Sequence, residues 1–378
     1  MTQPDTAGNA GFVRTEYADF SAPLALQSGA SLQNWRLAYQ TCGKLNTAKN
    51  NAVLVCHALS GSQHAAGIDA DNNVGWWDNF IGPGKPVDTE KFFVVCPNNL
   101  GGCHGSTGPA SLHPDDNKPY GSRFPVVTVE DWVRSQKMLA EHLAIDCFAA
   151  VVGGSLGGMQ ALRWALDYPD GLRAAVAIAA AARLSALNIA FNDIARQAIL
   201  HDPHFCGGDY LARDTFPRRG LTVARMLGHV TYLSGAAMAA KFGRTRRAES
   251  ARFDYETEFE VESYLRYQGA KFSGLFDANT YLLMTRALDY FDPAAESGGD
   301  LARAFGAARA EFFLLSFSSD WRFPPSSSRE LARALLASGK QTSYMEVQTE
   351  EGHDSFLLAN PVYHNAVRAF MSRLAAQL

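Results

Sequence analysis

A serine between glycines is the residue in this chain whose type and neighbours most clearly indicate catalytic chemistry. Residues 153–157 read Gly-Gly-Ser-Leu-Gly, which fits the G-x-S-x-G pattern. In this pattern the glycines allow a sharp turn from a strand into a helix, and the turn lifts the serine hydroxyl clear of the sheet. The apolar run CFAAVVGG precedes Ser155 and the helix-like segment MQALRWAL follows it. This context predicts that Ser155 is a nucleophile, and a chance match in a chain with 32 glycines is the alternative.

A serine hydroxyl is a weak nucleophile, so it needs a general base, and an acid must orient that base. Asp320 ends the strand-like run FFLLSFSSD, and His353 follows the last such run, in EEGHDSF. Serine, acid and histidine then occur in the chain order typical of this turn. We predict that Asp320 orients His353 and that His353 is the general base. Alternatives for these roles, or for the nucleophile, are His57, His64, His229, Asp292, Asp300, and Cys103 with His104.

Attack by a serine on a carbonyl also requires backbone N–H groups that stabilise the oxyanion. The residue after the nucleophile and a loop after an early strand supply these groups, which here predicts Leu156 and Leu59. The sequence indicates no cofactor and no metal. IGPGKP lacks the spacing of a P-loop, no G-x-G-x-x-G occurs, and the six cysteines contain no C-x-x-C pair.

Buried strands must position these residues. Three nearly continuous apolar runs, at 51–59, 91–99 and 147–154, are typical of parallel strands covered on both faces. Between the last two, TVEDWVRSQKMLAEHLAI has helical periodicity, and Thr128 can cap its start. Alternation of strand and helix predicts a mostly parallel, doubly wound α/β sheet.

The pattern becomes helical after GLRAAVAIAAAARL and returns to strands at AEFFLLSFSSD and TSYMEVQTEEGH. We therefore predict a helical domain inserted into an α/β core. The expected divisions are 1–185 for the first part of the core, 186–300 for the inserted helical lid, and 301–378 for the second part of the core.

Composition excludes several classes of protein. The 378 residues carry a formal charge of −4, and the only short basic run is FGRTRRAES, so nucleic-acid binding is not expected. The longest apolar stretch, AAVAIAAAA, is far shorter than the roughly 20 residues that span a bilayer. The first residues contain no apolar region of signal-peptide type. We expect a soluble cytoplasmic protein that binds no membrane.

Longer motifs carry a more specific signal. From about Asn51 to the C-terminus the chain resembles the homoserine O-acyltransferases of the α/β-hydrolase fold. The motifs that carry this resemblance include NAVLVCHALSGSQHAAG, NNLGGCHGSTGP, GGSLGGMQAL, LSALNIAFN, RMLGHVTYLS, DANTYLLMTRALDYFD, SDWRFPP and GHDSFLL. The resemblance implies a ping-pong reaction in which an acyl-CoA acylates Ser155 and the hydroxyl of L-homoserine, activated by His353, takes the acyl group. It also implies that Arg225 binds the homoserine carboxylate and that Asp354 binds its ammonium.

The resemblance also bears on the acyl donor, because in this family the residue at position 322 is associated with the choice between acetyl-CoA and succinyl-CoA. Here it is Arg322, whereas acetyl-transferring members more often have an apolar residue. A guanidinium can neutralise the free carboxylate of a succinyl group, so we predict succinyl-CoA, with acetyl-CoA as the alternative. The same triad could serve a serine hydrolase, and a binding protein without activity is a further alternative. Family likeness and surplus apolar positions in the helical insertion suggest a homodimer.

Overall fold

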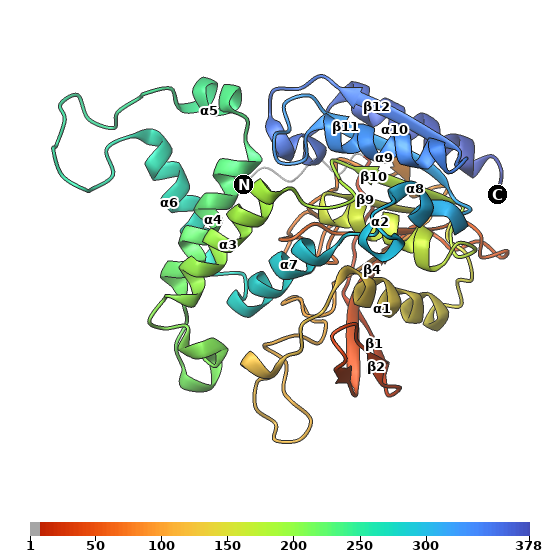
Figure 1. Cartoon of the computed structure of the whole chain (residues 1–378), viewed down its shortest axis with the longest axis horizontal. Coiled ribbons are helices and arrows are strands. Elements are labelled where there is room, and N and C mark those ends of the chain that lie inside the picture. Colours follow the sequence, from red (N-terminus) through yellow and green to blue (C-terminus); the bar gives the residue numbers. More distant parts are fainter. Residues whose placement is uncertain (1–7) are drawn as a thin grey trace.

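The computed structural model describes residues 8–378, and a central sheet of eight strands organises them (Figure 1). The spatial order is β1-β4-β8-β5-β9-β10-β11-β12. The six neighbouring strands β8, β5, β9, β10, β11 and β12 pair in parallel. Strand β4 is antiparallel to both β1 and β8. The bounds are β1 Glu16–Phe20, β4 Trp35–Cys42, β5 Ala52–Cys56, β8 Phe93–Pro97, β9 Ala150–Gly154, β10 Ala174–Ile178, β11 Glu311–Phe317 and β12 Thr342–Val347. This sheet confirms the predicted mostly parallel α/β class.

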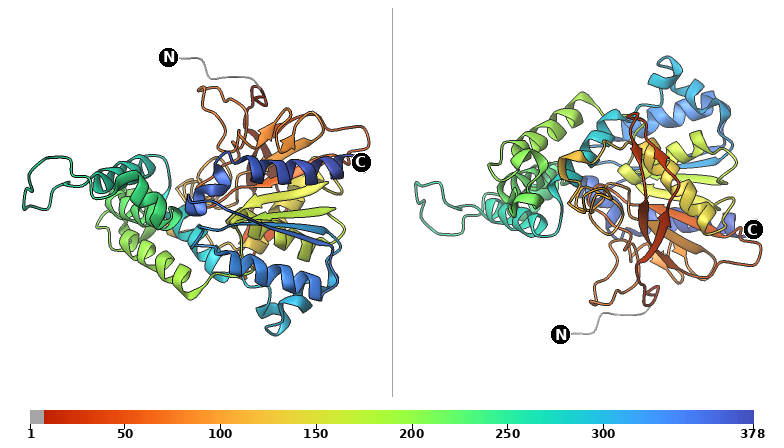
Figure 2. Two further views of the ribbon diagram at one scale, coloured as in Figure 1. Left: turned by 90° about the horizontal axis from the view of Figure 1, so that it is seen from above. Right: turned by 90° about the horizontal axis from the view of Figure 1, so that it is seen from below.

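The central strands are apolar throughout because helices and loops cover both faces of the sheet. Every residue of β5, β9 and β10 is buried. One face packs against α1 (Val129–His142), α2 (Leu156–Asp167) and α9 (Pro325–Ala337). The other packs against α10 (Pro361–Ala375) and the segment around Trp77, and Figure 2 shows these two layers. The sheet is therefore doubly wound, as predicted.

Short elements complete the core. The start of α1 is capped as expected, because the Thr128 side chain accepts a hydrogen bond from the backbone N–H of Asp131. Two-residue strands form two small separate sheets, namely β2 Leu24–Ala25 with β3 Ser31–Leu32, and β6 Ile81–Gly82 with β7 Val87–Asp88. The short 3-10 helices are η1 Gly121–Arg123, η2 Cys206–Gly208, η3 Leu211–Arg213, η4 Ala295–Ser297, η5 Phe305–Ala307 and η6 Gly352–Leu357.

A helical segment connects β10 to β11 and stands beside the carboxyl ends of the parallel strands (Figures 1 and 2). Its helices are α3 Ala186–Leu200, α4 Arg218–Tyr232, α5 Gly235–Phe242, α6 Glu260–Ser273, α7 Ala278–Tyr290 and α8 Leu301–Ala304. Helix α4 packs between α3 and α6, and α7 also contacts α3. Helices α3 to α7 lie within the range 186–300 in which the sequence predicts them, whereas α8 begins just beyond it, at Leu301. The division into separate domains stays a prediction. No helix within residues 8–378 combines the length and the apolar character needed to span a membrane.

Candidate active site

Ser155 lies at the corner between β9 and α2, in a backbone conformation that few residues adopt. Its φ of 57° and ψ of −123° fall outside the regions favoured by L-residues. The glycines around it are required by close packing. A Cβ on Gly153 would lie 2.1 Å from the carbonyl carbon of Gly157, and a Cβ on Gly157 would lie 2.0 Å from the oxygen of Cys56. The corner therefore requires glycine at positions 153 and 157, and it presents the Ser155 hydroxyl above the sheet.

The three residues selected for serine chemistry meet at this corner. His353 Nε2 lies 2.9 Å from Ser155 Oγ, and His353 Nδ1 lies 2.7 Å from Asp320 Oδ2. Asp320 follows β11, and His353 lies in η6, after β12. Asp320 Oδ1 also accepts hydrogen bonds from the backbone N–H groups of Arg322 and Phe323, at 3.0 and 2.8 Å. The carboxylate is thus fixed so that it accepts from Nδ1–H, which leaves Nε2 free to accept the serine proton.

The alternative residues are occupied elsewhere. His57 Nε2 accepts a hydrogen bond from the backbone N–H of Asn99, and burial lowers the pKa of His57 to about 4. Burial raises the pKa of the Cys103 thiol to about 12, so this cysteine remains protonated near neutral pH. His64 forms a hydrogen bond with the side chain of Gln40, and His229 forms one with the hydroxyl of Tyr264. Asp292 accepts from the backbone N–H groups of Ala294 and Ala295, and Asp300 accepts from that of Arg303.

Leu59 and Leu156 flank the serine from two elements. Leu156 is the first residue of α2, where a backbone N–H has no acceptor within its own helix. Leu59 follows β5 and lines the cavity beside Ser155, and the carbonyl oxygen of the preceding Ala58 lies 2.7 Å from His57 Nδ1. The two backbone N–H groups are placed in the chain as an oxyanion site requires.

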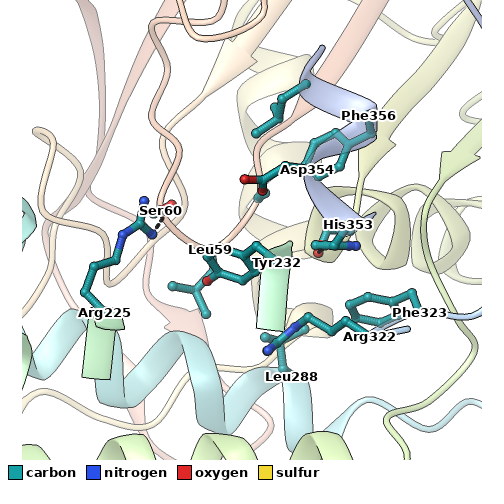
Figure 3. A pocket seen from close by; sticks show the side chains of 13 residues that line it. Leu59, Ser60, Arg225, Tyr232, Leu288, Arg322, Phe323, His353, Asp354 and Phe356 are labelled. Atoms are coloured by element: carbon teal, nitrogen blue, oxygen red, sulfur yellow. Dashed lines mark hydrogen bonds between the residues drawn. The ribbon is translucent and has the colours of Figure 1, made fainter. Parts of the chain in front are cut away.

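A cavity of about 120 Å³ opens beside Ser155 and His353, and Figure 3 shows the side chains that line it. The core contributes its floor, and α4 and α7 of the helical segment contribute its opposite wall. The lining residues are Ala58, Leu59, Ser60, Ser155, Arg225, Tyr232, Leu288, Arg322, Phe323, His353, Asp354, Phe356 and Leu357. It therefore holds every residue predicted for the site except Leu156 and Asp320.

Arg225 reaches the cavity from α4. Its Nη1 donates to Ser60 Oγ at 3.3 Å (Figure 3). Its guanidinium lies over the rings of Phe272 and Tyr232, at 4.5 and 5.6 Å from their centres. Among residues 8–378, no carboxylate oxygen lies within 4.0 Å of its nitrogens. Without the family resemblance, an ordinary surface ion pair would be the expectation for this arginine. The structure instead shows a cation that is available to an anionic ligand.

Asp354 adds the opposite charge to the same cavity. It follows His353 in η6 and lines the cavity together with Arg225. Burial raises the pKa of the Asp354 carboxyl, while the nearby charges of His353 and Arg225 oppose that shift. The cavity thus contains separate cationic and anionic groups, which is the arrangement that a zwitterionic amino acid needs.

Arg322 is a second cation at this cavity, and it is almost fully buried, with 8% of its surface exposed. Its Nη1 donates to Thr231 Oγ1 at 2.7 Å, and its Nη2 donates to Asn192 Oδ1 at 3.3 Å. Tyr232 lies between the two arginines, because the Arg322 guanidinium is also 5.6 Å from the centre of its ring (Figure 3). Sequence reasoning singled out Arg322 but not Asn192, Thr231 or Tyr232, whose only signal is their presence in the motifs LSALNIAFN and RMLGHVTYLS.

Comparisons with known proteins agree with this geometry. A family model described as the alpha/beta hydrolase fold matches residues 51–359. A protein named homoserine O-succinyltransferase from Bordetella pertussis is 58% identical, over 99% of this chain and 92% of its own length. One of the same name from Nitrosospira multiformis is 60% identical, over 96% of this chain and 97% of its own.

Two solved structures are also similar over almost the whole chain. The homoserine O-acetyltransferase from Bacillus anthracis is 26% identical with a TM-score of 0.89, covering 95% of this chain and 98% of that one. Esterase E22 is 28% identical with a TM-score of 0.87, covering 95% of this chain and 100% of that one. The shared architecture therefore accommodates both acyl transfer and ester hydrolysis.

Proposed function

Because the chain belongs to the homoserine O-acyltransferase family of the alpha/beta hydrolase fold, we propose that it transfers a succinyl group from succinyl-CoA to the hydroxyl of L-homoserine. The products are O-succinyl-L-homoserine and CoA, which places the enzyme in methionine biosynthesis. Relatives named homoserine O-succinyltransferase, at 58 to 60% identity, support the reaction. The observation that carries the choice of donor is Arg322, a buried cation at the cavity beside Ser155 that has no carboxylate partner within residues 8–378.

Acylation of the enzyme is the first half of the proposed cycle. Ser155 Oγ attacks the thioester carbonyl while His353 Nε2 accepts the hydroxyl proton, and the backbone N–H groups of Leu59 and Leu156 stabilise the oxyanion. The C–S bond then breaks, and His353 gives the proton to the departing thiolate of CoA. Asp320 holds His353 in the required tautomer and stabilises its positive charge throughout.

Transfer to homoserine is the second half. Arg225 binds the carboxylate of homoserine and Asp354 binds its ammonium, which directs the side-chain hydroxyl toward the acyl-serine ester. His353 removes the hydroxyl proton as the oxygen attacks the ester carbonyl, and it then returns the proton to Ser155 Oγ as the acyl bond breaks. No metal or prosthetic group is required, because the bond energy comes from the thioester.

Arg322 supplies the donor selectivity. A succinyl group ends in a carboxylate that can form charge-assisted hydrogen bonds with a guanidinium, whereas an acetyl group has no such partner. Binding the succinyl carboxylate would also relieve the cost of keeping this cation buried. Acetyl transfer and hydrolysis are the competing functions, and hydrolysis has a specific observation in its favour, namely the esterase neighbour.

Release of free thiol from the acyl-CoA separates these functions. With succinyl-CoA we expect at most one equivalent of thiol per active site without homoserine, and continuous release once homoserine is added. Continuous release without homoserine would identify a hydrolase, and no release in either case would identify a binding protein. Faster turnover of acetyl-CoA than of succinyl-CoA would reassign the donor.

We further propose that the enzyme acts in the cytoplasm as a homodimer. Helices α3 and α4 expose several large apolar side chains, including Leu187, Ile194 and Val223. Such surfaces commonly mark contacts between proteins. Sedimentation velocity at micromolar concentration tests the dimer, and a single monomeric species would contradict it.

A further inference from the structure

Two neutral oxygens from the helical segment hold the Arg322 guanidinium. Thr231, on α4, is fully buried and accepts from Nη1, while Asn192, on α3, is 3% exposed and accepts from Nη2. In the described part of the chain, no Asp or Glu oxygen lies within 4.0 Å of these nitrogens. A buried cation normally requires an anionic partner. The surroundings of Arg322 therefore fix its geometry without cancelling its charge.

Each neutral oxygen is itself oriented by a further partner. The Thr231 hydroxyl donates its proton to the carbonyl oxygen of Gly228 at 2.8 Å, so a lone pair of Oγ1 faces Arg322. Asn192 Nδ2 donates to Asp289 Oδ1 at 2.8 Å, which turns the amide oxygen toward Arg322. Neither acceptor can reverse without losing a buried hydrogen bond.

The carboxylate behind Asn192 already has a cation of its own. Asp289 Oδ2 lies 2.7 Å from Arg196 Nη1, and both side chains are almost completely buried, at 6% and 5% exposure. The amide of Asn192 thus stands between the Arg196–Asp289 ion pair and Arg322. The amide is oriented by its hydrogen bond to Asp289, and it separates the Asp289 carboxylate from the guanidinium of Arg322.

We propose that Asn192, together with Thr231, is a positioning residue for acyl-donor selection: it holds Arg322 at the cavity as an unneutralised cation that binds the terminal carboxylate of the acyl group. This inference rests on the proposed function, and it names Asn192 and Thr231 as the residues that orient Arg322 toward the acyl carboxylate. An aspartate at position 192 has nearly the shape of asparagine but carries a charge. It would pair with Arg322 and compete with the carboxylate of the donor.

The test compares Asn192→Asp with Gln197→Glu, a matched amide-to-carboxylate change at an exposed position of the same helix. Kinetic constants are measured with succinyl-CoA and with acetyl-CoA at saturating homoserine. We expect Asn192→Asp to lower the ratio of succinyl to acetyl efficiency by about tenfold or more, as loss of a hydrogen bond between charged groups does. The loss should arise mainly from a higher KM for succinyl-CoA, and Gln197→Glu should leave the ratio unchanged.

A second pair of variants covers the case in which Asn192→Asp does not fold, as judged by circular dichroism. Thr231→Val removes one acceptor of Arg322, and Thr231→Ser retains it. We expect the valine variant to have a lower ratio of succinyl to acetyl efficiency than the wild type, and the serine variant to keep the ratio of the wild type. An unchanged ratio, or equal losses with both donors, in folded variants would overturn the inference. If the wild type itself favours acetyl-CoA, the proposed function fails; if it favours succinyl-CoA and the ratio never moves, only the role of Asn192 and Thr231 fails.

Discussion

Replacement of Arg322 by leucine is the most direct test of donor selection. In the proposed complex the guanidinium forms a charge-assisted hydrogen bond with the succinyl carboxylate in a largely desolvated cavity. Hydrogen bonds to charged groups contribute about 1.5 to 3 kcal/mol, which corresponds to about ten- to a hundredfold in the rate constant for succinyl transfer. An acetyl group loses no partner, so its efficiency should hold steady or rise. The ratio of the two efficiencies should therefore fall by about the same ten- to hundredfold factor.

The structure also defines a cost of this substitution that must be separated from catalysis. Leucine leaves Thr231 Oγ1 and Asn192 Oδ1 without the donor that they have in the wild type. Each unsatisfied buried group costs about 1 to 3 kcal/mol, so the variant should be less stable. The donor ratio is insensitive to this loss as long as the assay temperature lies well below the melting temperature, because both donors use the same folded enzyme.

Steady-state rates with each donor, at saturating homoserine, measure the ratio for the wild type and for Arg322→Leu. Arg322→Lys is the matched variant that keeps the charge but loses the planar fork, and we expect an intermediate ratio from it. Equal losses for the two donors in Arg322→Leu would show that the arginine is structural. A wild type that prefers acetyl-CoA would refute the assignment of the donor itself.

Three further substitutions test the remaining roles. Ser155→Ala should abolish transfer and leave the fold intact, and mass spectrometry should detect no succinylated protein; a covalent succinyl group on this variant would point to another nucleophile, first of all Cys103. Asp320→Asn should favour the wrong tautomer of His353 and reduce turnover by on the order of 10⁴, as in other triads, so a loss below tenfold would exclude it as the orienting acid. Asp354→Asn should raise the KM for homoserine by about tenfold or more while formation of the acyl-enzyme continues; slower acylation of this variant, measured by the burst of thiol release, would show that the carboxylate acts on His353 instead.

The fold and the triad residues could be predicted because local patterns specify them. Ser155 and Asp320 each follow a strand with a nearly continuous apolar sequence, β9 and β11, whereas His353 follows the more polar edge strand β12, in which only Val347 is buried. Parallel strands bring their carboxyl ends to one edge of the sheet, so all three residues meet there. The antiparallel strand β1 was harder to predict. Its sequence EYADF has only Ala18 fully buried, so it lacks the apolar run that identifies a central strand.

The residues around Arg322 could not be predicted in the same way. Asn192 and Thr231 lie on amphipathic helices, where a polar residue usually faces solvent. Their burial arises because α3 packs against α4 and α7, and these contacts depend on the tertiary structure. Arg225 was selected only through the family resemblance, because its residue type and helical context are equally typical of a surface ion pair.

The geometry of the triad does not distinguish acyl transfer from hydrolysis, since an esterase and an acetyltransferase share this architecture. The distinction must come from groups that favour one acceptor over water. Arg225 and Asp354 place opposite charges in the cavity that contains Ser155 and His353, so an amino acid held by both would occupy the space through which water reaches the ester. Binding energy from these two charges would orient the homoserine hydroxyl for attack, whereas water gains nothing from them. In the proposed function, selectivity for the acceptor thus depends on Arg225 and Asp354, selectivity for the donor depends on Arg322, and the triad serves both half-reactions unchanged.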